Sequence, residues 1–361
     1  MLACIILCFA LLRLIIALIN LLFRQSLTIA DKGNDLVTVI VPVRNEAKNI
    51  GNILEDLRSQ THSNLEIIVF DDQSSDNTAA IVNSIAATNR QVILLKSTGL
   101  PEGWLGKNHA CHTASLNSKG KWFLFIDADV RLEPNVIDLA LGKLKSERLG
   151  LLSIFPRQTM QTLGEQLTVP LMNQILLSLL PLILIRKSGM IAFSAANGQF
   201  MLFDGAIYKT LKPHEQFQHE KVEDLSIARY MKKQKIRIAS IASVPEVNCR
   251  MYGSYYEALH GFSKNILQIF GGSVIVSILY WLVTTVGFLP VLLTFGLEGF
   301  LFYLVTVVLI RFIISFISHQ NILKNIVNMI PQQITLIRII TLAIWLQSRK
   351  KLKWKDRNIS L

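Results

Sequence analysis

Three long apolar segments constrain the fold of this chain most strongly. They are residues 2–23, 273–293 and 299–316. Because a helix of about 20 apolar residues crosses the hydrocarbon core of a bilayer, we expect an N-terminal transmembrane helix and a C-terminal transmembrane hairpin. The composition agrees, since 51% of the 361 residues are hydrophobic and 17% are charged, against about 25% charged residues in soluble domains.

The basic residues predict how these segments are oriented. The net charge is +12, and Arg24 and Lys32 follow the first segment whereas no charged side chain precedes it. Basic loops stay on the cytoplasmic side, so we expect a multi-pass protein of the cell (inner) membrane with residues after 24 in the cytoplasm. The basic residues cluster beside apolar segments, which favours anionic lipid over nucleic acid as a partner. Arg13 inside the first segment is costly in a bilayer unless it pairs or snorkels.

Two shorter apolar segments are predicted to lie on the membrane rather than to cross it. Residues 167–185 contain two prolines and several polar side chains, and one extra crossing would place the following residues outside the cell. We therefore prefer an interfacial helix pair, with a full span as the alternative. Residues 334–346 bear Arg338 and precede a basic cytoplasmic tail, 348–361, which favours an amphipathic helix on the inner leaflet.

Residues 36–265 alternate between strand and helix patterns. Apolar, β-branched runs predict buried strands at 36–43, 65–70, 92–95 and 122–126. Alternating strands and helices imply an α/β domain with a mostly parallel sheet. Such sheets bind ligands at the carboxyl ends of their strands. The residues at or just after the ends of these strands include Pro42, Asn45, Glu46, Asp71, Asp72, Asp127 and Asp129.

Asp127 and Asp129 directly follow the apolar run 122–126. Alternate residues of extended chain point the same way, so both carboxylates can face one site. Hard oxygen ligands suit Mg²⁺ or Mn²⁺ held together with the phosphates of a substrate. An ordinary polar turn explains this triplet equally well when it is taken alone.

Two other motifs supply candidate site residues. Lys107 ends the loop Gly-Trp-Leu-Gly-Lys and starts a predicted helix, where free backbone donors favour a phosphate; a solvated lysine is the alternative. Glu223 and Asp224 start another predicted helix. The helix dipole favours acidic residues at that position, so a helix-capping role is the alternative to a catalytic role. The cysteines show no metal-ligand or redox spacing and are interpreted as reduced and structural. They are Cys4, Cys8, Cys111 and Cys249.

The order of these motifs resembles that of family 2 glycosyltransferases. The motifs are Val-Pro-Val-Arg-Asn-Glu, Val-Phe-Asp-Asp-Gln-Ser-Ser-Asp, Gly-Trp-Leu-Gly-Lys, Phe-Ile-Asp-Ala-Asp and Val-Glu-Asp-Leu. The resemblance covers residues 37 to about 265, and the flanking apolar segments match the membrane-bound members. The Trp-Leu-Gly-Lys loop, the Ala-Asn-Gly-Gln-Phe segment and the ending Leu-Lys-Trp-Lys-Asp-Arg look like those of bacterial carotenoid-acid and hopanoid-associated glycosyltransferases. Ceramide glucosyltransferases are more distantly similar.

The resemblance implies a GT-A fold that binds a sugar nucleotide, usually a UDP-sugar, with Mg²⁺ or Mn²⁺. It also implies roles for the candidate residues. Pro42, Asn45 and Glu46 would line the edge of the nucleotide pocket, and Asp71 and Asp72 would lie beside the nucleotide base. Lys107 would contact the nucleotide or diphosphate, Asp127 the ribose or sugar, and Asp129 the metal. Asp224, beside Glu223, would be the catalytic base.

The reaction needs these residue types independently of the resemblance. A metal stabilises the negative charge that develops on the leaving diphosphate, and a carboxylate takes the proton of the attacking hydroxyl. A single base opposite the leaving group gives inversion. Polysaccharide synthases of the family carry Gln-x-x-Arg-Trp, whereas residues 256–265 here read Tyr-Glu-Ala-Leu-His-Gly-Phe-Ser-Lys-Asn. Lys264 would then supply a cation to the diphosphate, and single transfer is favoured over chain growth.

We therefore expect an inverting hexosyltransferase that moves one sugar from a UDP-sugar to a membrane lipid of the carotenoid, hopanoid, sphingolipid or glycerolipid type. The apolar segment 167–185 would form a lateral entrance for that lipid, or would only anchor the domain. Transfer to a polyprenyl phosphate or a growing polysaccharide is the enzymatic alternative. A catalytically inactive membrane scaffold is the alternative from another class.

Overall fold

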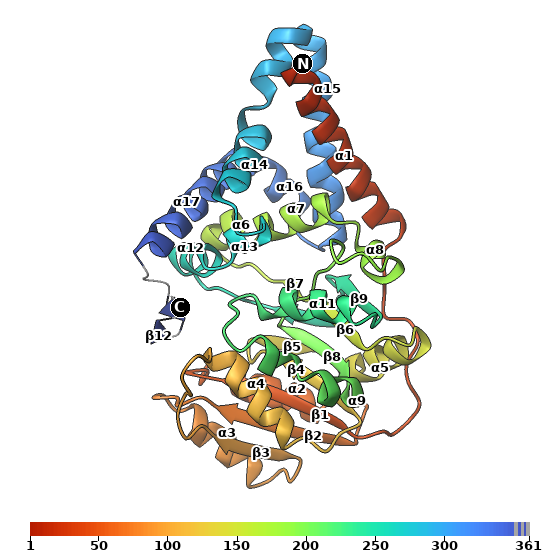
Figure 1. Ribbon diagram of the computed structural model, residues 1–361, viewed down its shortest axis with the longest axis vertical. Coiled ribbons are helices and arrows are strands. Elements are labelled where there is room, and N and C mark those ends of the chain that lie inside the picture. The colour runs from red at the N-terminus through yellow and green to blue at the C-terminus, as the bar shows by residue number, and fades with distance from the viewer. Residues whose placement is uncertain (350–352, 355–356, 359–361) are drawn as a thin grey trace.

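The computed structural model describes residues 1–349 and the backbone of residues 353–354 and 357–358. An α/β domain occupies one end of the molecule, and long apolar helices converge at the other end, where the N-terminus lies (Figure 1). Most of the basic tail predicted at 348–361, with its Leu-Lys-Trp-Lys-Asp-Arg motif, lies outside the described residues.

A seven-stranded sheet with the order β3-β2-β1-β4-β8-β6-β9 forms the centre of the α/β domain. The four strands predicted from the sequence pair in parallel, whereas β8 runs antiparallel to β4 and β6. The sheet is therefore mixed but mostly parallel, as expected. Its strands are β1 (Val37–Val43), β2 (Leu65–Asp71), β3 (Val92–Lys96), β4 (Trp122–Ile126), β6 (Leu151–Phe155), β8 (Phe200–Asp204) and β9 (Ile238–Ala242). A smaller sheet pairs β5 (Val130–Leu132), β10 (Val247–Cys249) and β7 (Arg157–Gln158).

Both faces of the large sheet are buried, which explains the continuous apolar runs of its strands. Val39 and Val41 of β1 belong to one core cluster, and Ile40 belongs to the cluster on the other side. The first cluster includes residues of α2 (Ile50–Arg58), α3 (Thr78–Ala86) and α5 (Val136–Ser146), and the second includes residues of α4 (Gly106–Leu116), α9 (Gly205–Leu211) and α11 (Glu223–Lys233). A short helix, α10 (Pro213–Gln216), lies between α9 and α11 in the chain.

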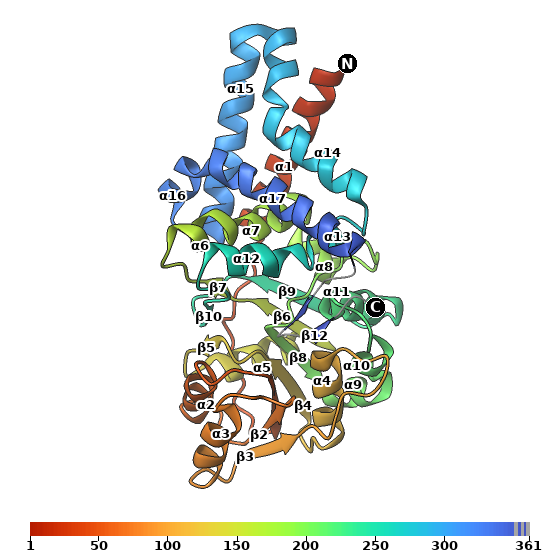
Figure 2. The same cartoon turned by 90° about the vertical axis from the view of Figure 1, so that its left-hand side faces the viewer.

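Three helical segments in the described part of the chain are long and apolar enough to cross a membrane: Leu2–Leu22, Val274–Ile317 and Met329–Ser348. The first is α1. The second comprises α14 (Val274–Val286) and α15 (Phe288–Ile317), and α15 is broken at Gly296, where φ is 64°. Figure 2 shows that the chain reverses there, so the predicted helical hairpin forms with its turn at Gly296. The third is α17, which begins five residues earlier than the predicted segment because Pro331 is tolerated in a first helical turn.

Arg13 of α1 is buried and paired. Its Nε donates to Ser178 Oγ at 3.1 Å, and its guanidinium lies over the rings of Phe9 and Tyr280. These contacts lower the cost of burying a charge among apolar helices.

The apolar segment 167–185 is divided among three short helices between the α/β domain and the long helices (Figure 1). They are α6 (Leu163–Thr168), α7 (Pro170–Leu179) and α8 (Leu182–Lys187). Asn20 of α1 ties the segment in place, because its side-chain amide donates to Leu177 O and Leu180 O and accepts from Leu182 N–H. A location in the headgroup layer stays a prediction.

A close approach in the α/β domain gives a testable prediction. A Cβ added at Gly142 in α5 would lie 1.9 Å from the carbonyl oxygen of Ile29, so the linker after α1 can pass over α5 only at a glycine. We expect Gly142→Ala to lower the free energy of unfolding by roughly 2 kcal/mol, although alanine favours helix. Thermal unfolding in detergent measures this, with Gly189→Ala as control because no described atom lies within 4 Å of its added Cβ. Equal melting temperatures for the two variants would contradict it.

Candidate active site

The residues predicted to edge a nucleotide pocket lie in two loops that hydrogen-bond to each other. β1 pairs with β2 up to Val43 and Asp71, so both loops start at one edge of the sheet. The amide of Asn45, which has a φ of 54°, donates to Ser74 Oγ at 3.0 Å, and its side-chain oxygen accepts from Ser75 N–H at 2.8 Å. The loops therefore form one rigid edge beside the β1–β4 pair, where the strand order reverses.

The other predicted nucleotide residues line the same edge. Glu46 N–H donates to Thr78 Oγ1 at 2.8 Å, Asp71 Oδ1 accepts from Ser74 N–H at 2.9 Å, and Pro42 is half-buried in β1. Asp72 is 1% exposed. The nucleotide base would therefore contact the Asp72 carboxylate only if the neighbouring atoms that bury it moved.

Lys107 lies at the centre of an acidic cluster. Its Nζ is 2.9 Å from Asp127 Oδ1 and 3.4 Å from Glu223 Oε1, and it donates to Gly198 O at 3.5 Å. Burial lowers the pKa of Lys107, but the neighbouring carboxylates outweigh burial and hold that pKa well above its ordinary value. Lys107 is therefore held as a cation between these carboxylates, with 24% of its side chain exposed, rather than being a freely solvated lysine.

The Glu223–Asp224 pair begins α11 but does not cap it through a side chain at the N-cap position, which is Val222. Asp224 Oδ2 accepts from Gly198 N–H at 2.9 Å, and its Oδ1 accepts from Leu225 N–H at 2.7 Å. Burial raises the pKa of Asp224 and raises the pKa of Glu223 to about 7, although Lys107 opposes both shifts. Glu223 is thus poised to hold a proton near neutral pH, and the pKa of Asp224 is shifted in the same direction.

Asp129 presents an unused oxygen at the same edge. Its Oδ1 is buried and has no hydrogen-bond partner in the part of the chain that the structure describes. Burial, with the charges of Asp127 and Glu46, raises the pKa of Asp129 to about 7. A buried, unpaired carboxylate oxygen fits a cation ligand.

The protein would supply few of the ligands of such a cation. The described residues contain no group of three or more histidine, cysteine, aspartate or glutamate side chains that could hold a metal. Mg²⁺ and Mn²⁺ accept carboxylate, water and phosphate oxygens, and Mg²⁺ is often held by one or two carboxylates together with substrate phosphates. Asp129 therefore fits a metal that binds together with a diphosphate.

The raised pKa of Asp129 predicts a pH dependence of stability. Between about pH 4 and about pH 7 the metal-free folded protein binds a proton at Asp129 that the unfolded chain releases, so this group lowers stability as pH rises. In EDTA, we expect the apparent melting temperature of Asp129→Asn to rise relative to that of the wild type as the pH increases through this range. Adding Mn²⁺ above about pH 7 should then stabilise the wild type alone. If the melting temperatures of the wild type and Asp129→Asn changed with pH in parallel, both with and without Mn²⁺, this assignment would be contradicted.

Three residues near the cluster were not predicted as site residues. A Cβ added at Gly198 would lie 2.9 Å from Lys107 Nζ and 3.2 Å from Glu223 Oε1, so a side chain there would press on the charged cluster. Gln199 Nε2 lies 2.9 Å from the sulfur of Cys249, which contacts Asp129. The Ala-Asn-Gly-Gln-Phe motif was the sequence signal that could have identified Gly198 and Gln199.

Lys264, which was predicted, directly follows α12 (Tyr255–Ser263) and is half-buried.

Comparisons with known proteins agree with this geometry. Residues 38–203 match the glycosyl transferase family 2 model. The chain is 26% identical over 262 residues to 4,4'-diaponeurosporenoate glycosyltransferase of Staphylococcus aureus strain MRSA252, and the match covers 68% of this chain and 65% of that relative. The chain thus aligns with slightly less than two thirds of the relative's length. A mannosyltransferase from Pyrobaculum calidifontis, solved in complex with GDP-Man and Mn²⁺, superimposes with a TM-score of 0.57 at 18% identity, over 96% of this chain and 99% of that one.

The fold and the matched motifs define a GT-A type α/β transferase domain that carries long apolar helices. Residues 38–203 carry the match to glycosyltransferase family 2, and the chain is a distant homologue, at 26% identity, of the carotenoid-acid enzyme. The resemblance found in the sequence is therefore confirmed at the level of the family.

Proposed function

We propose that this protein is an inverting, metal-dependent hexosyltransferase that moves one sugar from a UDP-sugar to a lipid of the cell membrane, with its catalytic domain in the cytoplasm. The observation that carries the proposal is the contact of Lys107 with Asp127 and Glu223, next to Asp224 and the unpaired oxygen of Asp129.

The donor would bind along the edge formed by the loops after β1, β2 and β4. The nucleotide would lie against Pro42, Asn45, Glu46, Asp71 and Asp72, and the sugar side against Asp127. Lys107, and Lys264 after α12, would offer positive charge to the diphosphate. Asp129 would hold Mg²⁺ or Mn²⁺, which supplies Lewis-acid stabilisation of the leaving diphosphate when it is bound.

Asp224 would act as the general base. Two backbone amides fix its carboxylate, and burial raises its pKa, which makes it a stronger base near neutral pH. It would accept the proton of an acceptor hydroxyl on the face opposite the diphosphate, so that a single displacement inverts the anomeric carbon. Glu223 would position Lys107, because its carboxylate lies 3.4 Å from the Lys107 ammonium.

Two observations support a lipid acceptor. Three helical segments are long and apolar enough to cross a membrane, and the named Staphylococcus relative is a diaponeurosporenoate glycosyltransferase. A polyprenyl-phosphate or polysaccharide acceptor is the enzymatic alternative. The intact charged cluster argues against an inactive scaffold, since burying several carboxylates without a function is costly.

Nucleotide release tests the donor assignment. Purified protein in lipid nanodiscs would be incubated with UDP-sugars and GDP-sugars, with Mn²⁺, with Mg²⁺ or with EDTA, and the released nucleoside diphosphate measured. We expect release of UDP that depends on the divalent cation. Release from GDP-mannose alone would overturn the UDP assignment, and binding or release of no sugar nucleotide would support the scaffold.

A further inference from the structure

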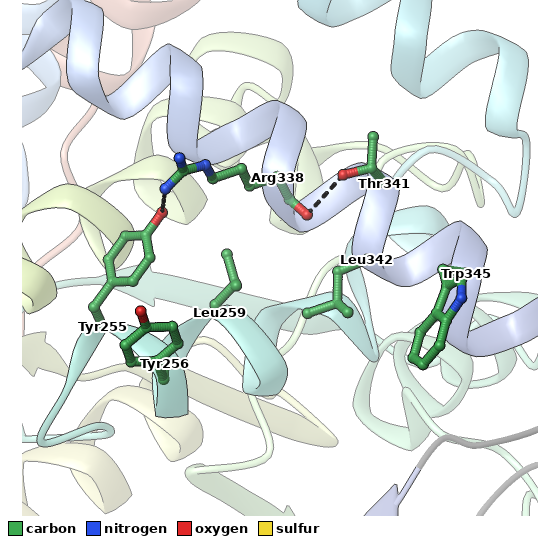
Figure 3. A pocket seen from close by; sticks show the side chains of 7 residues that line it. All are labelled: Tyr255, Tyr256, Leu259, Arg338, Thr341, Leu342 and Trp345. Carbon is green, nitrogen blue, oxygen red and sulfur yellow. Dashed lines mark hydrogen bonds between the residues drawn. The ribbon is translucent and has the colours of Figure 1, made fainter.

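A cavity of about 490 Å³ lies between α12 and α17. Figure 3 shows that side chains from the two helices face each other across it. Arg338 lies toward one end and Trp345 toward the other. Its lining includes Tyr255, Tyr256 and Leu259 of α12 and Arg338, Leu342 and Trp345 of α17.

The chemistry of this cavity is that of a site for an acidic amphiphile. Apart from Arg338 and Thr341, its lining side chains are aromatic or aliphatic, yet Tyr256 and Trp345 are 74% and 50% exposed. Exposed aromatic side chains beside helices of membrane-spanning length are typical of a lipid interface. Arg338, whose Nη1 lies 3.5 Å from Tyr255 Oη, adds a guanidinium that can bind a carboxylate or a phosphate.

The cavity is connected to the candidate active site through side-chain packing. Leu342 lines the cavity and also belongs to a small cluster with Leu346 and Leu105. Leu105 is the residue before α4, two positions before Lys107. The wall of the cavity is therefore continuous with the loop that positions the Lys107 ammonium.

Side chains of the apolar segment 167–185 are packed against neighbouring helices. Leu171, Ile175 and Leu177 of α7 are at most 1% exposed and belong to core clusters with other helices. These side chains pack the segment against its neighbours, which favours the anchoring alternative for this segment.

We infer that the cavity between α12 and α17 binds the acceptor before transfer, and that the acceptor is an acidic lipid. Its apolar chain lies along Leu259, Leu342 and Trp345, and Arg338 binds its carboxylate or phosphate. The inference rests on the proposed function and adds the chemical class of the acceptor and its place of entry.

Filling the cavity tests the acceptor role. Leu342→Trp should raise the apparent KM for the lipid acceptor about tenfold or more, because the indole occupies the space of the chain, and should change the KM for the UDP-sugar far less. Ile334→Trp is the matched control, since Ile334 lies on the same helix, is 51% exposed and does not line the cavity. Arg338→Gln should weaken acceptor binding about tenfold, and Arg338→Lys should restore part of it.

Photocrosslinking measures occupancy independently of transfer. A benzoylphenylalanine at position 342, and at position 334 as control, would be irradiated in nanodiscs made with native lipid extract, and the adducts identified by mass spectrometry. We expect an acidic lipid enriched at 342 that oleic acid displaces and oleyl alcohol does not. Bulk phospholipid at both positions, with an unchanged acceptor KM in Leu342→Trp, would overturn the inference.

The two proposals fail in different ways. If the wild type transfers sugar to lipid and Leu342→Trp does so with the same acceptor KM, the cavity inference is wrong and the proposed function stands. If the wild type transfers sugar to no lipid, the proposed function is wrong, and the acceptor role of the cavity falls with it whatever lipid crosslinks at 342.

Discussion

Replacing Asp224 with asparagine is expected to lower the transfer rate by roughly 10²- to 10⁴-fold, the usual contribution of a general base. Asparagine has the same shape and can still accept from Gly198 N–H, which lies 2.9 Å from Asp224 Oδ2, so the loop should keep its position. The amide cannot take a proton from the acceptor hydroxyl. Donor affinity, measured by calorimetry with UDP and Mn²⁺, should therefore change little.

Glu223→Gln is the companion variant, because Glu223 is adjacent and also has a pKa raised by burial. We expect a smaller loss of turnover, since Glu223 would only position Lys107, together with an altered pH profile. Retained turnover in Asp224→Asn would contradict the assignment of the base. An equal loss in both variants would assign the base to the pair rather than to Asp224.

Replacing Lys107 with methionine is expected to lower kcat/KM by roughly 10²- to 10³-fold, the typical cost of removing one electrostatic contact to the transition state. Lys107 balances the charges of Asp127 and Glu223. Without it, these carboxylates would repel the diphosphate, and the pKa of Glu223 would rise further. Both kcat and donor affinity should fall, which steady-state kinetics with varied UDP-sugar would show.

Lys145→Met is a matched control for that variant. Lys145 also contacts two carboxylates, those of Asp31 and Asp35, with its Nζ 2.9 Å from Asp35 Oδ2. These groups tie the linker after α1 to α5, away from the acidic cluster of the site. We expect Lys145→Met to keep kcat/KM while its melting temperature falls slightly. An equal loss of kcat/KM in both lysine variants would mean that general stability, rather than charge at the site, explains the effect.

The sequence predicted the features that depend on local patterns. The strands β1, β2 and β4 are largely apolar because both faces of the sheet are buried there, and Asp127 and Asp129 follow such a run. The hairpin of long helices was predicted from two apolar segments with a short polar interruption, and Gly296 supplies the positive φ at its turn. The order of short motifs was enough to recognise the family.

The features that the sequence did not predict depend on contacts between distant residues. The antiparallel insertion of β8 between β4 and β6 follows from pairing across the sheet. Gly198 lies beside the charged ends of Lys107 and Glu223, which are 91 and 25 positions away. The partner of Arg13 is Ser178, 165 positions away. The cavity between α12 and α17 follows from how two helices pack, which hydrophobic periodicity does not specify.

The most direct measurement of the central claim is the mass of the lipid product. Purified protein in nanodiscs made with native lipid extract would be incubated with a panel of UDP-sugars and Mn²⁺, and the lipid fraction analysed by mass spectrometry. We expect a new lipid heavier by one sugar residue, absent with Asp224→Asn. Release of UDP without any sugar-bearing lipid, or a lipid that carries a growing chain of sugars, would contradict it.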